Sequence, residues 1–271
     1  MWKEELKFAE NLVREAGKIL MRFYESSYEI DIKQQNEPVT QADKASNEFI
    51  TSQLRKNFPD YGILAEESKD DFKRLTHKRL WLVDPMDGTR EFIDKVGQFS
   101  VMIGLVENHR PVLGVVFQPT TNKLYSAIKN QGAYLTAGNE RTRLQVSDVE
   151  EIAKMRLVVS RSHRAKLVDA MKKALGVHQE VSSGSVGLKV GLLAEANSDL
   201  YLHPNSKTKE WDTCAPDIIL QEAGGIMTDL WGEPLQYNKR DVYNQRGFIA
   251  SNGKMHYEIV KKIQPFLNQL T

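Results

Sequence analysis

Apolar residues recur every three or four positions over residues 3–24, which predicts an amphipathic helix with one buried face. A second helix is predicted from Thr40, a capping residue, to about Phe58, where the turn-forming residues 60–62 end it. The pattern then changes to short apolar runs at residues 81–83, 100–106, 112–118 and 123–127, separated by turn-like segments. These runs predict a meander of strands, and residues 142–147 are a candidate edge strand.

From about residue 155, strand and helix patterns alternate. Strands are expected at 157–159, 199–202, 226–230 and 248–250, and helices at 163–175, 188–196, 211–223 and 254–270. Gly224 and Gly225 form the usual signal for a helix end. This order predicts a layered α/β (α+β) protein with two lobes in one compact unit, an α+β lobe over residues 1–152 and an α/β lobe over residues 153–271.

Composition narrows the functional classes. The chain has 271 residues, of which 41% are hydrophobic and 27% charged, so its core needs no covalent support. Its formal charge of +1 argues against a nucleic acid partner. The single cysteine, Cys214, excludes an intrachain disulfide and suits a reducing compartment. No apolar stretch approaches the roughly 20 residues of a membrane span, and the charged start is unlike a signal peptide. We therefore expect a soluble, cytoplasmic protein with no membrane partner.

A set of acidic residues at marked positions indicates metal chemistry. Asp84 and Asp87 stand three residues apart in a turn after the strand at 81–83, so both carboxylates can point into one small volume. Such oxygens suit hard divalent cations, and Gly88 and Thr89 can approach an anion. The other candidates are Asp43, Glu66, Glu67 and Asp212. Each acid also has an ordinary interpretation, as a turn residue, a solvated surface acid or a helix cap.

Four blocks, in order along the chain, resemble the inositol monophosphatase superfamily of metal-dependent, lithium-sensitive phosphatases. They read PVTQAD at 38–43, AEES at 65–68, WLVDPMDGTREF at 81–92, and WDTCAP at 211–216 followed by QEAGG at 221–225. The resemblance extends from about residue 5 to 252, and the last two blocks are highly specific. The segments REFI at 90–93, GQFSV at 97–101, VSRSH at 159–163 and GSVGLK at 184–189 resemble the branch of CysQ-type 3'(2'),5'-bisphosphate nucleotidases.

The resemblance implies the fold and the metal site. The fold would be a layered αβαβα sandwich with the site between its lobes. The implied metal ligands are Glu66, Asp84, the Met86 carbonyl, Asp87 and Asp212. They would hold two to three Mg²⁺ ions, because an all-oxygen ligand set favours Mg²⁺, or Mn²⁺, over Zn²⁺.

The resemblance also implies roles around the metals. Thr89 and Asp43 would orient and deprotonate the attacking water, with Glu67 close by and the amides of Gly88 and Thr89 on the phosphate. The implied substrate-binding residues are Gly88, Thr89, Ser160, Arg161, Ser162, His163, Gly184, Ser185, Lys189 and Glu210. Among these, Lys189 would meet a second phosphate and Glu210 a substrate hydroxyl. In the ordinary interpretation, Arg161 and His163 lie in a solvated loop and Lys189 is an exposed helix residue.

The implied reaction is hydrolysis of adenosine 3',5'-bisphosphate to AMP and phosphate, a step of sulfur metabolism that could extend to 3'-phosphoadenylylsulfate. Inositol 1-phosphate or another sugar phosphate is the alternative substrate. One departure bears on this choice, because similar nucleotidases carry a phosphate-binding Arg before Glu-Trp-Asp and this chain has none there. His203, Lys207 or Lys209 could replace it, although Lys binds phosphate as a point charge rather than as a fork.

Three rival interpretations are weaker. Haloacid dehalogenase phosphatases have one residue between their two motif acids, whereas two separate Asp84 from Asp87. A phosphate loop does not match, because Leu188 separates Gly187 from Lys189. A non-catalytic metal or nucleotide sensor could use the same fold, but every position that the chemistry needs is filled. Dimers are common in the superfamily, and this sequence leaves a homodimer open.

Overall fold

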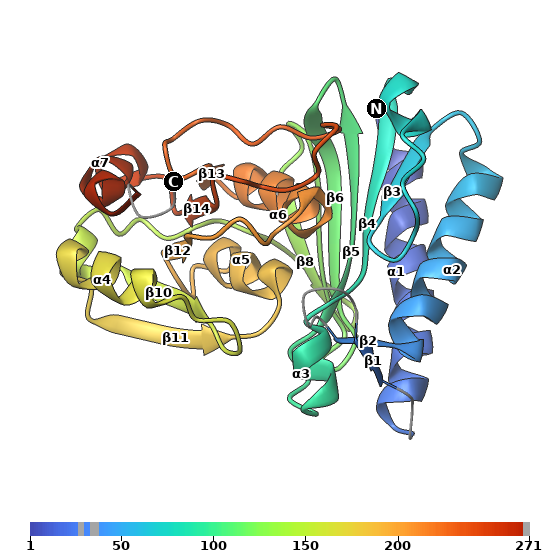
Figure 1. The fold of residues 1–271 in the computed structure, drawn as a ribbon, viewed down its shortest axis with the longest axis horizontal. Coiled ribbons are helices and arrows are strands. Elements are labelled where there is room, and N and C mark those ends of the chain that lie inside the picture. The colour runs from blue at the N-terminus through green and yellow to red at the C-terminus, as the bar shows by residue number, and fades with distance from the viewer. Residues whose placement is uncertain (27–29, 33–37, 268–271) are drawn as a thin grey trace.

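Five layers stack side by side in the computed structural model, which describes residues 1–26, 30–32 and 38–267 (Figure 1). Helices α1 (Lys3–Tyr24) and α2 (Gln41–Asn57) cover the outer face of a seven-stranded sheet. Helices α5 (Val186–Ala194) and α6 (Glu210–Glu222) separate this sheet from a five-stranded one. Helices α4 (Lys166–Leu175) and α7 (His256–Leu267) form the last layer. The predicted αβαβα sandwich is confirmed.

The large sheet contains the predicted meander. Its order is β3 (Gly62–Ala65), β4 (Arg79–Asp87), β5 (Ser100–Glu107), β6 (Arg110–Gln118), β7 (Lys123–Ile128), β8 (Ala133–Ala137) and β9 (Glu140–Arg143). Only the β3–β4 pair is parallel. The predicted edge strand at 142–147 is wrong in its bounds, and β8 was not predicted. All four residues of β9 are exposed and β8 is only partly buried, so neither has the alternation that marks a strand.

The small sheet has the order β11 (Gln179–Ser183), β10 (Arg156–Ser160), β12 (Leu200–His203), β14 (Phe248–Ser251) and β13 (Ile226–Thr228). Strand β11 was not predicted, because its polar and mostly exposed residues lack an apolar pattern. Helix α4 begins three residues later than predicted, and α5 two residues earlier because Ser185 caps it. The last residues of the predicted helix at 254–270 lie outside the described residues. A short hairpin pairs β1 (Ile30–Ile32) with β2 (Pro38–Thr40).

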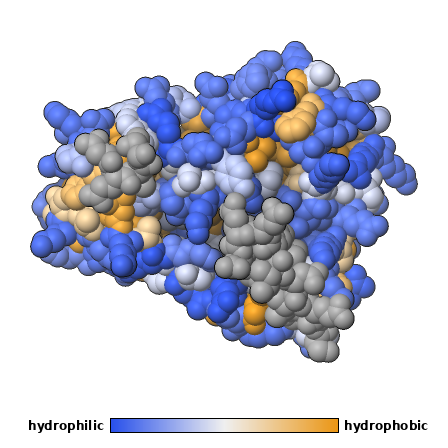
Figure 2. Space-filling view, in the orientation of Figure 1, coloured by the Kyte–Doolittle hydropathy of each residue, from blue (hydrophilic) through white to orange (hydrophobic). Residues whose placement is uncertain are grey.

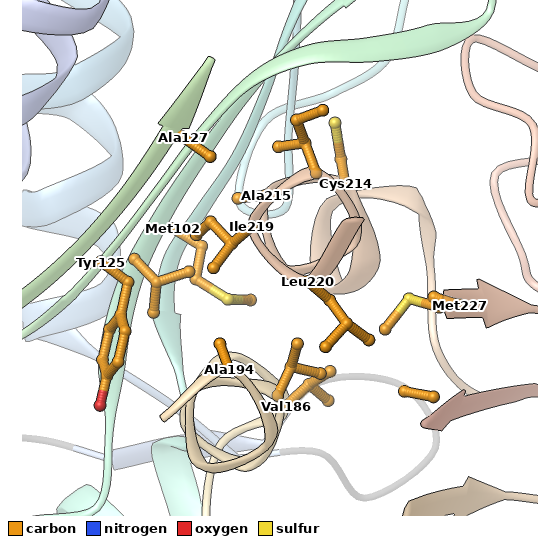
Figure 3. Packing of buried hydrophobic residues seen from close by; sticks show 14 of the residues in the cluster. Met102, Tyr125, Ala127, Val186, Ala194, Cys214, Ala215, Ile219, Leu220 and Met227 are labelled. Carbon is orange, nitrogen blue, oxygen red and sulfur yellow. The ribbon is translucent and has the colours of Figure 1, made fainter. Parts of the chain in front are cut away.

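The central apolar core holds α5 and α6 against the large sheet. Met102 on β5, Ile219 on α6 and Val186 on α5 point into the same apolar space (Figure 3). Helix α6 lies very close to the sheet at Gly114, where an added Cβ would lie 2.6 Å from the Ala215 carbonyl oxygen. This close approach matters for function, because the first turn of α6 carries Asp212.

Polar residues cover most of the face seen in Figure 2, with small apolar areas between them. Among the described residues, we find no helix whose length and apolar character would let it cross a membrane. The apolar core between the sheets combines residues from both predicted lobes, such as Leu82 and Tyr201. The lobe boundary at residue 152 stays a prediction.

Candidate active site

A cavity of about 520 Å³ opens between the two sheets, where β4 ends. Its walls come from the end of β4, the short helix α3 (Thr89–Ile93), the first turns of α5 and α6, and the loops after β10 and β12. Of the predicted site residues, it is lined by Glu66, Asp84, Met86, Asp87, Gly88, Thr89, Ser160, Ser162, His163, Ser185, Lys189 and Asp212. The fold therefore brings together residues from distant parts of the chain.

The end of β4 places the two motif aspartates. The pairing of β4 with β5 shifts register between Asp84 and Asp87, which bends the strand at this point. The amide of Met86 donates to Asp84 Oδ1 at 3.0 Å, so the turn is held by one of its own carboxylates. Gly88 has a φ of +100°, and a Cβ there would lie 3.0 Å from the Gln98 carbonyl oxygen. A side chain at this position would therefore be strained.

Thr89 and Asp43 are hydrogen-bonded although 46 residues separate them. The Thr89 hydroxyl donates to Asp43 Oδ1 at 3.0 Å, with the Met86 carbonyl oxygen 3.4 Å away. The hydroxyl and amide of Thr40 both donate to Asp43 Oδ2 at 2.7 Å, which confirms the predicted helix cap. Burial raises the pKa of Asp43 to about 6, against the opposing effect of these hydrogen bonds. Asp43 is therefore both a capping residue and a partner of a cavity hydroxyl.

Asp87 is linked to the start of α5. Its Oδ2 accepts from the Ser185 hydroxyl at 2.5 Å and from the Gly187 amide at 2.9 Å. The Lys189 ammonium donates to the Ser185 carbonyl at 2.7 Å, and this side chain is only 2% exposed. Burial lowers the pKa of Lys189 to about 8, although the charges of Asp87, Glu91 and Asp212 oppose the shift. The alternative of an exposed helix lysine is therefore wrong.

Like charges crowd the carboxylates of the cavity. Burial raises the pKa of Asp84, and the charges of Glu66, Asp87 and Asp212 raise it further. Burial raises the pKa of Asp212 to about 8, again with help from Glu66 and Asp87. The pKa of Asp87 is also raised by burial. A cluster of this kind is electrostatically unfavourable without a cation in the cavity.

The donor set fits a hard divalent cation. The acidic residues that line the cavity offer carboxylate oxygens, the ligands of Mg²⁺ and Mn²⁺. Hydrogen bonds from other described residues reach only one oxygen each of Asp84, Asp87 and Asp212. Within the described residues, no three His, Cys, Asp or Glu side chains are arranged to hold a metal ion as they stand. The fit therefore rests on the chemistry of the donors and on the repulsion between the carboxylates.

Several predicted residues do not line the cavity. The two carboxylate oxygens of Glu210 accept the amides of Asn238 and Lys239 at 2.6 and 2.9 Å, and its side chain is fully buried. It holds a loop rather than reaching toward a substrate. The Arg161 side chain pairs with Asp94 and Glu91. Glu67, Gly184 and Asp43 also lie outside the lining.

Strand β12 and the segment after it supply residues that sequence reasoning missed. Tyr201, Asn205 and Thr208 line the cavity beside His203. The Tyr201 hydroxyl lies 3.0 Å from His203 Nδ1, and His203 Nε2 lies 2.9 Å from Asn205 Oδ1. Burial lowers the pKa of His203 to about 3, so its ring is neutral and can accept from the tyrosine while donating to the asparagine. The signal available in the sequence is position, because these residues follow the carboxyl end of a buried strand.

Comparisons with known proteins agree with this geometry. The sequence profile of the Inositol monophosphatase family matches residues 1–267. The chain is 38% identical over 244 residues to the 3'(2'),5'-bisphosphate nucleotidase CysQ of Escherichia coli K12, covering 89% of this chain and 96% of that protein. It is similar to CysQ from Bacteroides thetaiotaomicron, with 32% identity, a TM-score of 0.79 and coverage of 93% and 98%. An IMPase from Thermotoga maritima gives 27% identity, a TM-score of 0.85 and coverage of 99% and 100%.

Proposed function

This chain belongs to the inositol monophosphatase family and is a metal-dependent phosphatase, and from that premise we propose that it is a 3'(2'),5'-bisphosphate nucleotidase. Its substrate would be adenosine 3',5'-bisphosphate, cleaved at the 3' position to AMP and phosphate. The relatives named CysQ support this assignment. A small phosphorylated substrate suits the cavity of about 520 Å³, which is in the size range of ligand pockets.

The observation that carries the proposal is the number of cationic side chains in the cavity. Arg90, Lys189, Lys207 and Lys209 line it together with the carboxylates. A phosphomonoester at the acidic end needs a bound cation there, and these side chains add positive charge that can meet a second anionic group, although Arg90 also pairs with Asp94 at 3.4 Å. Lys207 and Lys209 lie in the segment that lacks the family's arginine, so they are the candidates to replace it as point charges. A bisphosphate offers one phosphate to the metal and a second to the cationic side chains.

The acidic end would bind the metal. Glu66, Asp84, the Met86 carbonyl, Asp87 and Asp212 would hold Mg²⁺, two to three ions in our proposal, with Mn²⁺ as an alternative. When bound, such ions supply charge stabilisation for the phosphoryl group and acidify water. The hydrogen bonds of Asp87 to Ser185 and Gly187 orient its carboxylate before any ion arrives.

Thr89 and Asp43 would handle the proton of the attacking water. The Thr89 hydroxyl donates a hydrogen bond to Asp43. Its oxygen is therefore oriented to accept a hydrogen bond from a water in the cavity. Asp43, with a pKa of about 6, is mostly ionised near pH 7 and accepts the proton through the threonine hydroxyl. The two hydrogen bonds from Thr40 hold the other carboxylate oxygen in place. No covalent bond between enzyme and phosphate is required.

The test compares phosphate release from adenosine 3',5'-bisphosphate and inositol 1-phosphate under the same conditions, with Mg²⁺ and with a chelator. We expect a higher kcat/KM for the nucleotide and loss of release with chelator. Lys207→Ala should raise the KM for the bisphosphate more than the KM for the monophosphate. Lys56→Ala is the matched control, because Lys56 is an exposed lysine of α2 outside this cavity. A preference for inositol 1-phosphate would contradict the nucleotidase assignment.

A second candidate is an inositol 1-phosphate or sugar phosphate phosphatase. Two observations favour it, namely the missing arginine between residues 202 and 210 and the likeness to the Thermotoga maritima IMPase. In that case the four cations would meet no second phosphate, and Lys207→Ala would leave the KM unchanged. A sensor without activity would release no phosphate from either substrate, while Mg²⁺ would still raise the melting temperature.

A further inference from the structure

A second cavity, of about 510 Å³, lies between the amino-terminal half of α1 and strands β7 to β9. It shares no lining residue with the catalytic cavity. Leu6, Ile128 and Tyr134 provide apolar and aromatic surface, and Lys3, Lys7 and Arg141 provide positive charge. The phosphatase chemistry uses none of these residues, so the second cavity requires its own explanation.

Two polar atoms in the second cavity are buried without a hydrogen-bond partner. They are Oγ of Ser126, a residue that is 0% exposed, and Oε1 of Glu10. Within the described residues, five buried side-chain atoms lack a partner, and two of these five belong to residues that line this cavity. Buried polar atoms are normally satisfied, so each exception needs a reason. A ligand group that forms hydrogen bonds with both atoms would explain both exceptions.

The position of Ser126 in its strand is unusual for a hydroxyl. Side chains alternate along β7, so Leu124, Ser126 and Ile128 share the face that is turned toward α1. Leu124 and Ile128 belong to the apolar core beneath that helix. A polar side chain placed between them is unfavourable unless it has a partner. The second cavity is where that partner can enter.

Charge is distributed along the second cavity in a definite order. Lys3, Lys7 and Glu10 follow the spacing that places residues on one face of a helix. With a rise of 1.5 Å per residue, Glu10 lies about 5 Å along the axis from Lys7 and about 10 Å from Lys3. Arg141 is exposed at the rim, its guanidinium carbon 4.5 Å from the centroid of the Tyr134 ring. The buried end thus accepts hydrogen bonds, and the outer end attracts an anion.

We propose that the second cavity binds a nucleoside 5'-monophosphate whose base carries an exocyclic amino group. The amino group donates to Glu10 and Ser126, the base lies against Leu6, Ile128 and Tyr134, and the phosphate meets Lys3, Lys7 and Arg141. Inorganic phosphate alone does not fit, because it offers no apolar surface for Leu6, Ile128 and Tyr134 and the Glu10 carboxylate repels it. This site is independent of which phosphomonoester the enzyme hydrolyses.

Hydrogen–deuterium exchange on the full chain tests the proposal with cytidine 5'-monophosphate (CMP) as the probe. We expect CMP to slow exchange in peptides covering residues 3–10 and 126–134, read separately from peptides covering residues 84–93 in the catalytic cavity. Uridine 5'-monophosphate replaces the amino group by a carbonyl, and cytidine removes the phosphate. Each should need at least a tenfold higher concentration than CMP for the same protection.

Variants complete the test. Glu10→Gln with Ser126→Ala should abolish the protection by CMP at residues 3–10 and 126–134, whereas Ser198→Ala should keep it. Ser198 is the matched control, because its hydroxyl is also buried and unpartnered but does not line the second cavity. Protection confined to residues 84–93, or equal protection by the three compounds, would overturn the proposal. The ligand series on the unaltered protein decides the matter even if the double variant fails to fold.

Discussion

Thr89→Val isolates the proton-transfer step from the rest of the site. Valine has nearly the shape of threonine but cannot orient a water or donate to Asp43 Oδ1, which is 3.0 Å from the native hydroxyl. General acid–base catalysis contributes about 10²- to 10⁴-fold to a rate. At 1.36 kcal/mol for each factor of ten, we expect the activation barrier to rise by about 3–5 kcal/mol. The fall should be in kcat for phosphate release, with KM little changed.

The fold should tolerate this substitution. Asp43 keeps its two hydrogen bonds from Thr40, so the loss of one bond should lower the free energy of unfolding by about 1–2 kcal/mol. The lost bond normally lowers the pKa of Asp43, so this pKa should rise above its native value of about 6.

Thr89→Ser and Thr40→Val are the controls for this measurement. The serine keeps the hydroxyl and should retain most of kcat. Thr40→Val removes the helix cap and one hydrogen bond to Asp43, so it should cost about 1 kcal/mol of stability with a smaller effect on kcat. If folded Thr89→Val enzyme kept kcat within about threefold of wild type, the proposed role of Thr89 in general-base catalysis would be refuted.

Three further predictions concern the metal site, the pH dependence of stability and the packing of α6. Asp87→Asn should remove at least about three orders of magnitude of Mg²⁺-dependent turnover. It should not lower the melting temperature, because it relieves repulsion at Asp84 and Asp212. Retained activity would contradict the role of Asp87 as a ligand. Burial lowers the pKa of His256 to about 4, so its neutral form contributes stability above the unfolded-state pKa of 6.5, and that contribution is lost as the pH falls toward 4. Denaturant unfolding should show that, from pH 7 to pH 5, the free energy of unfolding of wild type falls by about 2 kcal/mol relative to that of His256→Gln, and parallel profiles would exclude this cause. Gly114→Ala should lower the free energy of unfolding by about 1–3 kcal/mol, since the methyl group would displace α6. Because Asp212 would move with α6, the Mg²⁺ concentration for half-maximal activity should rise. An unchanged Mg²⁺ requirement would show that the position of Asp212 does not depend on this contact.

Local patterns were sufficient for the elements that bury one regular face. The helix at residues 3–24 has the predicted bounds, and β5, β6 and β7 extend the predicted runs by one or two residues. Strand β4 is longer than predicted and includes Asp84 and Asp87, which were expected in a turn after the strand. Strands β8 and β11 were not predicted and β9 was predicted with wrong bounds; they are short and polar or exposed, and are held by pairing with a neighbouring strand. Periodicity reports burial, so an edge strand whose side chains face solvent leaves little trace in it.

The sequence by itself determined which residues are candidates for the chemistry. The spacing of Asp84 and Asp87 identified candidate ligands because it is a local feature, and the resemblance of the motif around Asp212 added that residue. Only the tertiary structure decided which candidates meet. It joined Thr89 to Asp43, buried Lys189 beside the carboxylates and turned Glu210 toward the loop at residues 238–239. The physical reason is that these contacts depend on how the layers stack, and the stacking is set by long-range packing that no local pattern records.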